Sequence, residues 1–341
     1  MPTVPIVSSR WRLHLGGRRV MDRNDVPVIV VSWNSGQKLV RWLDAVQRFR
    51  PPLGFKIRPV VVDNASSDIT ATIIGDAVSV GRVRAEDVHW LPANFGFVAA
   101  QNVVLRHLMA HTSCRWLATL NDDATADEDW LKNLVSAATS THPRGMKVGM
   151  FGGPIYDPLT SRISSSGHWM RRQDAAFLDI DRNLEAGEKG SLSSREGFEP
   201  FATCFAAALW SVAMLKSVGL PDSEQFAYYD DVELAYKARL EGWRVSYAPE
   251  ARAWHPLPQP KERGSLMWRH QCKGRLAIVC RYLPERERRR ILEGLSEEQR
   301  QVYNEMISED RTLTPIDSDE LRAAVWDEWA DRNQPAKRDS A

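Results

Sequence analysis

The 341-residue sequence predicts an α/β protein in which a mostly parallel sheet is flanked by helices and followed by a helical appendage. From Val26 onward, short apolar runs alternate with segments of helical periodicity, as in parallel strands joined by crossover helices. From Met267 the chain turns helical and highly charged. We therefore expect an N-terminal arm over residues 1–25, an α/β domain over 26–260 and a helical region over 261–341.

Four strands are expected in the first half of the chain, each a short apolar run with β-branched or aromatic residues. They cover residues 28–31, 59–62, 88–91 and 116–120. Helices are expected at 97–111 and 129–139, and another after the first strand, where apolar residues recur at helical spacing: Leu39, Leu43, Val46 and Phe49. Ser67 or Asp68 is placed to cap a helix after the second strand.

The second half continues the alternation with one interruption. A strand is expected at 148–153, helices at 212–218 and 230–240, each with a glycine beyond its end, and a strand at 243–248. Between these, over residues 156–199, periodicity fades and Ser, Gly, Arg and Asp accumulate. We expect loops and short strands there, which could move over an active site.

Composition argues against several classes of protein. Lys plus Arg (45) nearly balance Asp plus Glu (44), so no overall attraction to nucleic acid or to an anionic membrane is expected. A phosphate-binding P-loop, a dinucleotide-binding G-x-G-x-x-G and a nucleophile elbow are all absent from the sequence. Near residues 285–290 Arg is interleaved with Glu, which favours a solvated, ion-paired helix over a membrane-binding one.

Cysteine usage and the lack of long apolar runs predict a cytoplasmic protein. No run approaches the roughly 20 apolar residues that span a bilayer, and residues 1–25 contain no signal-peptide core. The cysteines form no C-x-x-C pair and no disulfide-like framework, and we expect them in the core: Cys114, Cys204, Cys272 and Cys280. Peripheral contact with a membrane is the second possibility for location.

An acidic cluster directly follows the strand expected at 116–120. Asn121, Asp122 and Asp123 would lie at the carboxyl edge of the sheet, where α/β proteins bind their ligands. Adjacent carboxylates repel each other, so without a cation or hydrogen-bond donors they would lower stability. The cluster therefore predicts a divalent-cation site, with a solvated loop as the alternative.

A second acidic cluster and a histidine complete the expected site. Asp230, Asp231 and Glu233 lie further along the chain, and His255 follows a later strand. Oxygen ligands plus one imidazole suit Mg²⁺ or Mn²⁺, and such an ion at a sheet edge suits a diphosphate substrate. Asp230 and Glu233 have the spacing of a capping box, which leaves Asp231 available as a general base.

Other polar positions have both structural and functional interpretations. Asp63, at a strand end, could accept a hydrogen bond from a base or ribose or could only shape a turn. Asn94 and Gly96 form another turn, in which Gly96 permits a positive φ or close approach to a ligand. His107 and His111 have i, i+4 spacing but lack the intervening acid of zinc proteases, so a zinc site is not favoured.

An ordered set of motifs runs through the α/β region. They are Val-Ser-Trp-Asn at 31–34, Val-Val-Asp-Asn-Ala-Ser-Ser-Asp at 61–68, Asn-Phe-Gly-Phe at 94–97 with Asn102, Leu-Asn-Asp-Asp at 120–123 and Tyr-Asp-Asp-Val-Glu-Leu at 229–234. In this order they resemble family 2 glycosyltransferases of the Rossmann-like GT-A fold, most closely the rhamnosyltransferase and galactofuranosyltransferase branch. The resemblance covers residues 26–284.

The resemblance implies an inverting transfer of a sugar from a UDP- or dTDP-linked donor to a hydroxyl of a glycan, lipid-linked or other acceptor. Asp63 would hold the nucleotide base, with Trp33 and Asn34 beside it. The remaining donor-side positions that match the family motifs are Asn94, Gly96, Asn102, Asn121 and Asp122. No nucleic-acid partner is implied.

The resemblance also implies a metal site and a base. Asn121 and Asp123 would occupy the outer positions of the D-x-D motif, and His255 would be a further ligand of Mn²⁺ or Mg²⁺. Asp231 would deprotonate the acceptor hydroxyl. Two departures stand out: Asn121 replaces the Asp of many relatives, and residues 203–208 replace the small-residue Ser-Gly stretch on the acceptor side.

Two other functions share the same sequence features. A catalytically silent module could bind nucleotide-sugars or glycans on this fold, although Asp123 and Asp231 argue for an enzyme. A sugar nucleotidyltransferase would carry a Gly-rich loop with Lys or Arg after the first strand, and residues 32–36 are not such a loop.

Overall fold

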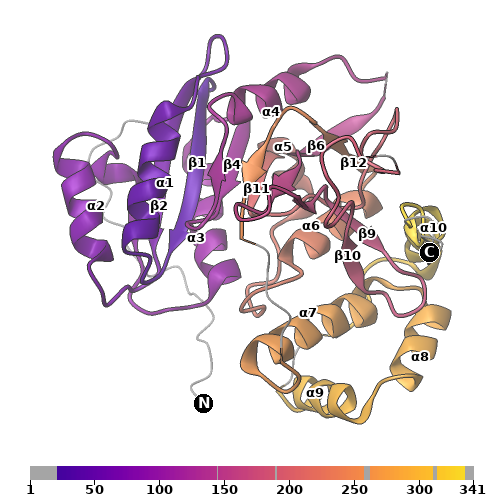
Figure 1. Ribbon diagram of the computed structural model, residues 1–341. Coiled ribbons are helices and arrows are strands. Elements are labelled where there is room, and N and C mark those ends of the chain that lie inside the picture. The colour runs from indigo at the N-terminus through magenta and orange to yellow at the C-terminus, as the bar shows by residue number, and fades with distance from the viewer. Residues whose placement is uncertain (1–20, 144, 189, 257–261, 310–312, 335–341) are drawn as a thin grey trace.

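A seven-stranded sheet forms the centre of the molecule in the computed structural model (Figure 1). The structure describes residues 21–143, 145–188, 190–256, 262–309 and 313–334. Most of the predicted N-terminal arm therefore lies outside the described residues. Of its last residues, Met21 is buried and Asp25 begins the first strand.

The strands follow the order β12-β6-β11-β4-β1-β2-β3 across this sheet. Their bounds are β1 (Asp25–Ser32), β2 (Lys56–Asp63), β3 (Val88–Trp90), β4 (Trp116–Leu120), β6 (Lys147–Gly152), β11 (Ala207–Ser211) and β12 (Trp243–Tyr247). β1 pairs in parallel with β2 and with β4, β2 with β3, and β6 with β12. The mostly parallel sheet predicted from the alternating pattern is confirmed.

The sequence pattern does not predict the antiparallel strand β11. It lies between β4 and β6 and runs antiparallel to both, with Ala207 opposite Leu120 and Leu209 opposite Phe151. All its residues are buried, so the run has no alternation of polar and apolar side chains. Its two alanines have a low intrinsic preference for strands. The strand conformation of β11 therefore depends on its pairing with β4 and β6.

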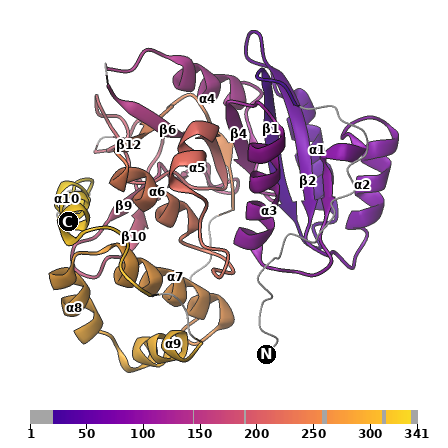
Figure 2. The same cartoon turned by 180° about the vertical axis from the view of Figure 1, so that it is seen from behind.

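Helices cover both faces of the sheet (Figures 1 and 2). One face packs against α1 (Gln37–Arg48), α2 (Thr70–Ser79) and α4 (Trp130–Thr139). The other packs against α3 (Phe97–His111), α5 (Val212–Val218) and α6 (Asp230–Leu240). Along β1, Val28 and Val30 face the first layer and Ile29 faces the second, as the alternation of a strand requires.

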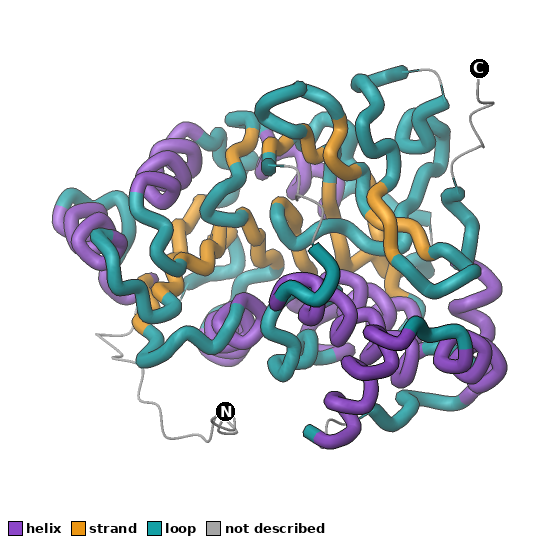
Figure 3. Tube along the Cα trace, turned by 60° about the horizontal axis from the view of Figure 1, so that its bottom comes forward, coloured by secondary structure: helices purple, strands orange, loops and turns teal. Residues whose placement is uncertain are grey.

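Residues 156–199, which the sequence assigns to loops and short strands, contain one small two-stranded sheet and part of another. One small sheet has the order β5-β13-β7-β8, and β9 pairs with β10 in another. The bounds are β5 (Thr125–Ala126), β7 (Ile155–Tyr156), β8 (Ile163–Ser165), β9 (His168–Met170), β10 (Phe177–Asp179) and β13 (Ala253–Trp254), and a 3-10 helix η1 (Ala85–Asp87) precedes β3. Figure 3 shows strands through the middle of the molecule with helices around them.

The C-terminal helices pack against the α6 side of the sheet. They are α7 (Leu266–Tyr282), α8 (Glu285–Glu293), α9 (Glu297–Ser308) and α10 (Asp319–Trp329). Ile278 and Tyr282 of α7 and Trp326 of α10 join the same buried cluster as α3 and α5. A second cluster joins α7 to α9 through Leu276 and Val302.

Two observations bear on the expected location. Within the described residues, the helices lack the combination of length and apolarity needed to traverse a bilayer. All four cysteines are free; three are buried and Cys204 is half-buried.

The capping-box interpretation of Asp230 and Glu233 is wrong. The N-cap of α6 is Tyr229, in the left-handed conformation and without a side-chain cap. Glu233 is fully buried and accepts hydrogen bonds from the Asp222 amide, the Gln225 amide group and the Tyr282 hydroxyl. The Glu233 carboxylate, which the spacing assigns to a helix cap, is therefore engaged by tertiary hydrogen bonds instead.

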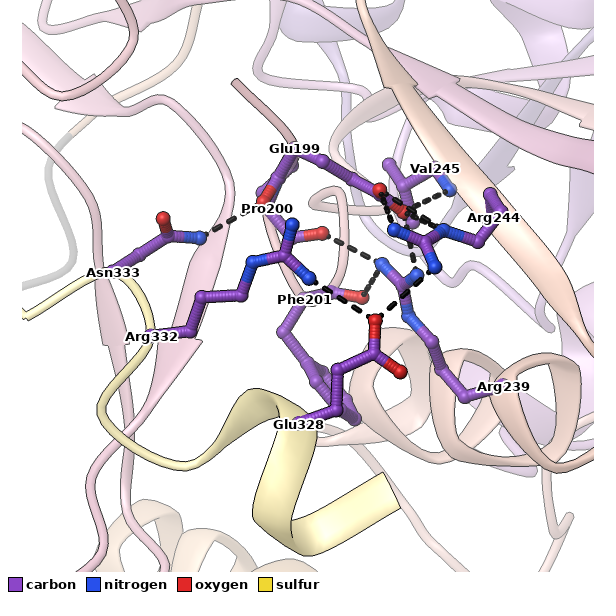
Figure 4. A network of polar contacts seen from close by, with 9 residues as sticks. All are labelled: Glu199, Pro200, Phe201, Arg239, Arg244, Val245, Glu328, Arg332 and Asn333. Carbon is purple, nitrogen blue, oxygen red and sulfur yellow. Dashed lines mark hydrogen bonds and ion pairs between the residues drawn. The ribbon is translucent and has the colours of Figure 1, made fainter. Parts of the chain in front are cut away.

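A buried charge network ties α6 to α10 (Figure 4). Arg239 of α6 lies 2.5 Å from Glu199, which also pairs with Arg244 at 2.6 Å. Arg244 contacts Glu328 of α10 at 3.1 Å, and the Arg239 guanidinium lies 3.6 Å from the centre of the Trp329 ring. Burial lowers the pKa of Arg239 to about 10, which leaves it charged at neutral pH. Glu199 is therefore the counter-ion on which this junction depends.

The change Glu199→Ala should lower the free energy of unfolding by about 3 kcal/mol, because it leaves the buried Arg239 without its counter-ion. The exposed pair of Glu250 and Arg252 supplies the control, since Glu250→Ala should cost less than about 1 kcal/mol. Urea denaturation at pH 7 measures both. Equal losses of unfolding free energy in the two variants would contradict the assignment of Glu199 as the counter-ion on which the junction depends.

The contribution of Glu199 should also depend on pH. Burial opposes ionisation of Glu199, but Arg239 and Arg244 outweigh it and hold its pKa below the ordinary 4.5. Because the folded-state pKa is depressed, the stabilisation is present above the unfolded pKa and is lost as pH falls through the folded one. The difference between wild type and Glu199→Ala should therefore shrink below pH 4.5 in denaturation curves.

Candidate active site

The carboxyl ends of β1, β2 and β4 meet at one edge of the sheet. Ser32 ends β1 opposite Asp63, which ends β2, and β4 ends at Leu120 next to the first acidic cluster. Parallel neighbours in register bring the loops that follow them together. The predicted donor-side and metal-side residues of these loops therefore gather at this edge.

The loops after β1 and β2 are bonded to each other. The Asn34 side chain accepts from the Ser67 amide at 2.7 Å, and the Asn34 amide donates to the Ser66 hydroxyl at 2.9 Å. Asp63 is buried; its Oδ2 accepts from the Ser66 amide, while its Oδ1 has no hydrogen-bond partner among the described residues. A buried carboxylate oxygen with a free lone pair is suited to a ligand donor. Trp33, which directly follows Ser32 in the chain, has 53% of its surface exposed.

The turn between β3 and α3 is held by a residue that the sequence does not single out. Asn64 is buried, donates to the Asn94 side chain at 2.9 Å and accepts from the Phe95 amide at 3.1 Å. Asn94 in turn accepts from the Gly96 amide. Asn64 follows Asp63 directly, so this contact fixes the turn at the end of β3 relative to the end of β2.

Two of the predicted donor-side residues serve internal contacts in the structure. Asn102 of α3 is fully buried and donates to the Pro221 carbonyl at 2.6 Å, which ties α3 to the segment before α6. Asp122 accepts a short hydrogen bond from the Ser35 hydroxyl. Burial outweighs that bond and raises the pKa of Asp122. Direct donor contact by either residue stays a prediction.

Asn121, Asp123 and His255 converge after β4. His255 Nε2 lies 3.1 Å from Asp123 Oδ1 and 3.4 Å from Asn121 Nδ2. Burial raises the pKa of Asp123, but His255 and the more distant Lys38 outweigh it, so the net shift is downward and favours the carboxylate. Carboxylate oxygen, imidazole nitrogen and an amide side chain form a donor set compatible with Mn²⁺ or Mg²⁺.

Asp231 belongs to a second polar group, at the start of α6. Its Oδ2 lies 3.1 Å from His168 Nε2, and His168 Nδ1 lies 3.3 Å from Asp179 Oδ1. The neighbouring Asp230 is buried, and burial together with repulsion from Asp231 raises its pKa well above the ordinary value. Of the two neighbouring aspartates, Asp231 forms the direct contact with the His168 imidazole, and Asp230 is the one whose ionisation is disfavoured.

One short segment contacts both polar groups. The Ala206 carbonyl accepts from the Asn121 amide at 2.9 Å, and Cys204 lies within 4.8 Å of the ligand atoms of His168 and Asp231. This segment precedes β11 and belongs to residues 203–208, the stretch that departs from the expected family pattern. β11 therefore brings the metal-side loop and the start of α6 to the same region.

Sequence reasoning assigns no role to His168, Asp179 or Asn64, because their partners are far away in the chain; Asn64 lies within the 61–68 motif, but no motif marks the other two. His107 and His111, the pair considered as a zinc site, lie on α3 with ring centroids 4.8 Å apart and ring planes tilted by 45°, and His107 also contacts the His89 ring of β3 edge-on. Predicting such contacts requires the pairing of strands and helices.

Comparisons with known proteins place the chain among sugar transferases. Residues 23–273 match the family described as "Glycosyltransferase like family 2". The succinoglycan biosynthesis protein ExoM of Rhizobium meliloti (strain 1021) is 27% identical over 156 residues, 45% of this chain and 43% of that protein. The chain therefore matches less than half the length of this relative.

Solved structures support the fold. GalNAc-T7 with UDP, GalNAc and Mn²⁺ is similar with a TM-score of 0.56 and 13% identity, covering 92% of this chain and 55% of that one. TarS 1-349 of S. aureus in complex with UDP gives a TM-score of 0.50 and 15% identity, covering 83% and 70%. The predicted GT-A fold is confirmed.

The turn at Gly96 should not tolerate a side chain. Gly96 has φ +85°, and a Cβ there would lie 2.6 Å from the Phe226 ring and 2.8 Å from its carbonyl oxygen. Gly96→Ala should therefore lower the free energy of unfolding by about 3 kcal/mol. Gly54→Ala is the matched control, because φ is +78° but nothing lies within 4 Å, and strain alone should cost about 1 kcal/mol. Equal losses in urea denaturation would exclude the steric contribution.

Proposed function

The chain belongs to glycosyltransferase-like family 2, and on that premise we propose that it transfers a sugar from a nucleoside-diphosphate sugar to a hydroxyl acceptor, with inversion at the anomeric carbon. The observation that carries the proposal is the meeting of Asn121, Asp123 and His255 at the sheet edge that also holds Asp63. A donor set suited to a cation, at the same sheet edge as a buried carboxylate oxygen that has no hydrogen-bond partner among the described residues, suits a ligand with both a diphosphate and a nucleoside.

The metal is assigned to Asp123 and His255, with Asn121 beside them. The chemistry of this donor set fits Mn²⁺ or Mg²⁺. When bound, the ion would neutralise charge on the departing nucleoside diphosphate. Asn121 supplies one charge fewer than an aspartate would, so we expect weaker metal binding in the absence of nucleotide.

The nucleoside is assigned to the loops after β1 and β2. Asp63 Oδ1 would accept a hydrogen bond from the base, and the exposed Trp33 would flank it. Asn34 would hold the two loops in this arrangement through its contacts to Ser66 and Ser67. UDP- and dTDP-sugars are the proposed donors, and UDP is tested first because two similar structures contain it.

Asp231 is assigned as the general base. It would take the proton of the acceptor hydroxyl as that oxygen bonds to the anomeric carbon and the bond to the diphosphate breaks. The proposed acceptor is a glycan or lipid-linked intermediate, in keeping with the succinoglycan biosynthesis role of ExoM. The four free cysteines fit a reducing compartment, and we propose a cytoplasmic location with peripheral membrane contact as the alternative.

The proposed metal site predicts a metal-dependent response to nucleotide. UDP or dTDP should raise the melting temperature when Mn²⁺ is present and have little effect without it. His255→Ala and Asp123→Asn should each abolish that difference, whereas His111→Gln, at an exposed position on α3, should retain it. Differential scanning fluorimetry measures this; equal stabilisation with and without Mn²⁺ would contradict the metal assignment.

The proposed base predicts loss of turnover with retained binding. Asp231→Asn should lower Mn²⁺-dependent release of nucleoside diphosphate from UDP-glucose, UDP-galactose or dTDP-rhamnose by about 10²–10⁴-fold. The thermal shift with UDP or dTDP should persist, and Asp76→Asn, an exposed change on α2, should leave turnover unaltered. Unchanged turnover in Asp231→Asn would exclude it as the base, and binding without turnover in the wild type would favour the silent module.

A further inference from the structure

His168 forms contacts that the proposed reaction does not yet explain. It begins β9 and lies directly opposite Asp179, the last residue of β10, in the antiparallel pair. Its imidazole contacts Asp179 through Nδ1 at 3.3 Å and Asp231 through Nε2 at 3.1 Å. One ring therefore bridges two carboxylates that come from different parts of the chain.

We propose that His168, held by Asp179, is a positioning residue that orients the Asp231 carboxylate for proton transfer. The inference rests on the proposed role of Asp231 as general base. His168 itself neither gains nor loses a proton in the step: the acceptor oxygen loses its proton to Asp231, bonds to the anomeric carbon, and the nucleoside diphosphate leaves with the electron pair of the broken bond.

The backbone fixes the position of the imidazole. The His168 amide donates to the Ala202 carbonyl at 2.9 Å, and the His168 carbonyl accepts from the Phe201 amide at 2.8 Å. The side chains of His168 and Asp231 are only 14% and 13% exposed. A ring held on both sides of its backbone, and bonded at both nitrogens, has little freedom to move when the acceptor binds.

Both oxygens of Asp231 are engaged from the protein side. Oδ2 contacts His168, and Oδ1 accepts from the Val232 amide at 2.8 Å. Each carboxylate oxygen offers two lone pairs, so a site for the acceptor proton remains on the group. The two contacts determine the orientation of the plane of the carboxylate, which is what a positioned base requires.

The surrounding charges favour an imidazolium. Burial opposes the charge on His168, but Asp231, Asp179 and a contact with Cys204 outweigh it and raise its pKa well above the ordinary value. Two further charged groups act within this cluster: Asp230, which interacts with both Asp231 and His168, and Arg182, which pairs with Asp179. An imidazolium between two carboxylates satisfies both of its N–H donors.

A side-chain NMR titration tests the charge state without any substrate. In ¹H–¹⁵N spectra of imidazole rings, the signal that is lost in His168→Gln identifies His168. It should remain protonated at pH 7.5, above the ordinary histidine pKa of about 6.5. Asp179→Asn and Asp231→Asn should each lower this pKa, whereas Asp76→Asn should not. A wild-type His168 that is neutral at pH 7.5 would overturn the proposal.

The split between kcat and KM tests the effect on Asp231. Loss of the imidazole contact in His168→Gln should lower kcat for Mn²⁺-dependent donor hydrolysis by about 10–100-fold, with the donor KM unchanged. Asp179→Asn should lower kcat by less, and His111→Gln should leave both constants unchanged.

The outcomes separate this inference from the proposed function. If Asp231→Asn is inactive but His168→Gln keeps the wild-type kcat, only the role of His168 is overturned. If Asp231→Asn keeps full turnover, the base assignment fails and the inference fails with it. Should His168→Gln not fold, as judged by its melting curve, Asp179→Asn carries the same test through both measurements.

The same atoms also allow a rival interpretation. His168, Cys204 and Asp231 each offer a ligand atom, and these atoms lie within 4.8 Å of one another. Nitrogen, sulfur and oxygen ligands at this spacing would suit Zn²⁺. Elemental analysis of the purified protein decides between the two: one equivalent of zinc that is lost in Cys204→Ser would overturn the positioning role, and less than a tenth of an equivalent would support it.

Discussion

The gathering of carboxylates at the carboxyl edge of the sheet is the constraint on which the rest of the structure depends. Asp63 ends β2, Asp122 and Asp123 follow β4, and Asp230 and Asp231 begin α6. Burial and mutual repulsion both act against so many negative charges. Contacts from other segments of the chain offset this repulsion: Ser35 contacts Asp122, His255 contacts Asp123 and His168 contacts Asp231. In the proposed metal site, Asn121 and Asp123 beside His255 would bind a cation in addition.

The C-terminal helices hold the helix that carries the proposed base. Near the start of α6, Glu233 accepts from the Tyr282 hydroxyl of α7. Near the end of α6, Arg239 pairs with Glu199 and lies over Trp329 of α10. Because both contacts are buried, loosening either helix would expose unpaired polar groups. The region predicted as an appendage thus contributes directly to the placement of α6.

Local patterns were sufficient where a segment has a clear period and clear ends. The expected helices at 97–111, 212–218 and 230–240 and the strand at 116–120 have the observed bounds. Patterns were insufficient where contacts with distant segments determine the local structure. β11 forms a strand because it pairs with β4 and β6, and Glu233 forms tertiary hydrogen bonds instead of capping its helix. For the site, ligand chemistry and the family resemblance grouped Asp123 with His255, and these side chains lie 3.1 Å apart, but no local signal links His168 or Asn64 to their partners.

Backbone strain at the entrance to α6 shows how the site and the core are coupled. Tyr228 and Tyr229 both have positive φ, +71° and +64°, a conformation that costs a large side chain of order 1–3 kcal/mol at each position. Gly274 of α7 lets the backbone approach closely there, since a Cβ on it would lie 3.1 Å from the Tyr228 carbonyl and from Tyr229 Cβ. The Tyr229 ring packs edge-on against Phe177, two residues before Asp179. One packing contact therefore supports both the strained turn that aims Asp231 and the strand that presents Asp179 to His168. Precise placement of the proposed base follows from core packing around the turn, because a relaxed turn would point the first residues of α6 elsewhere.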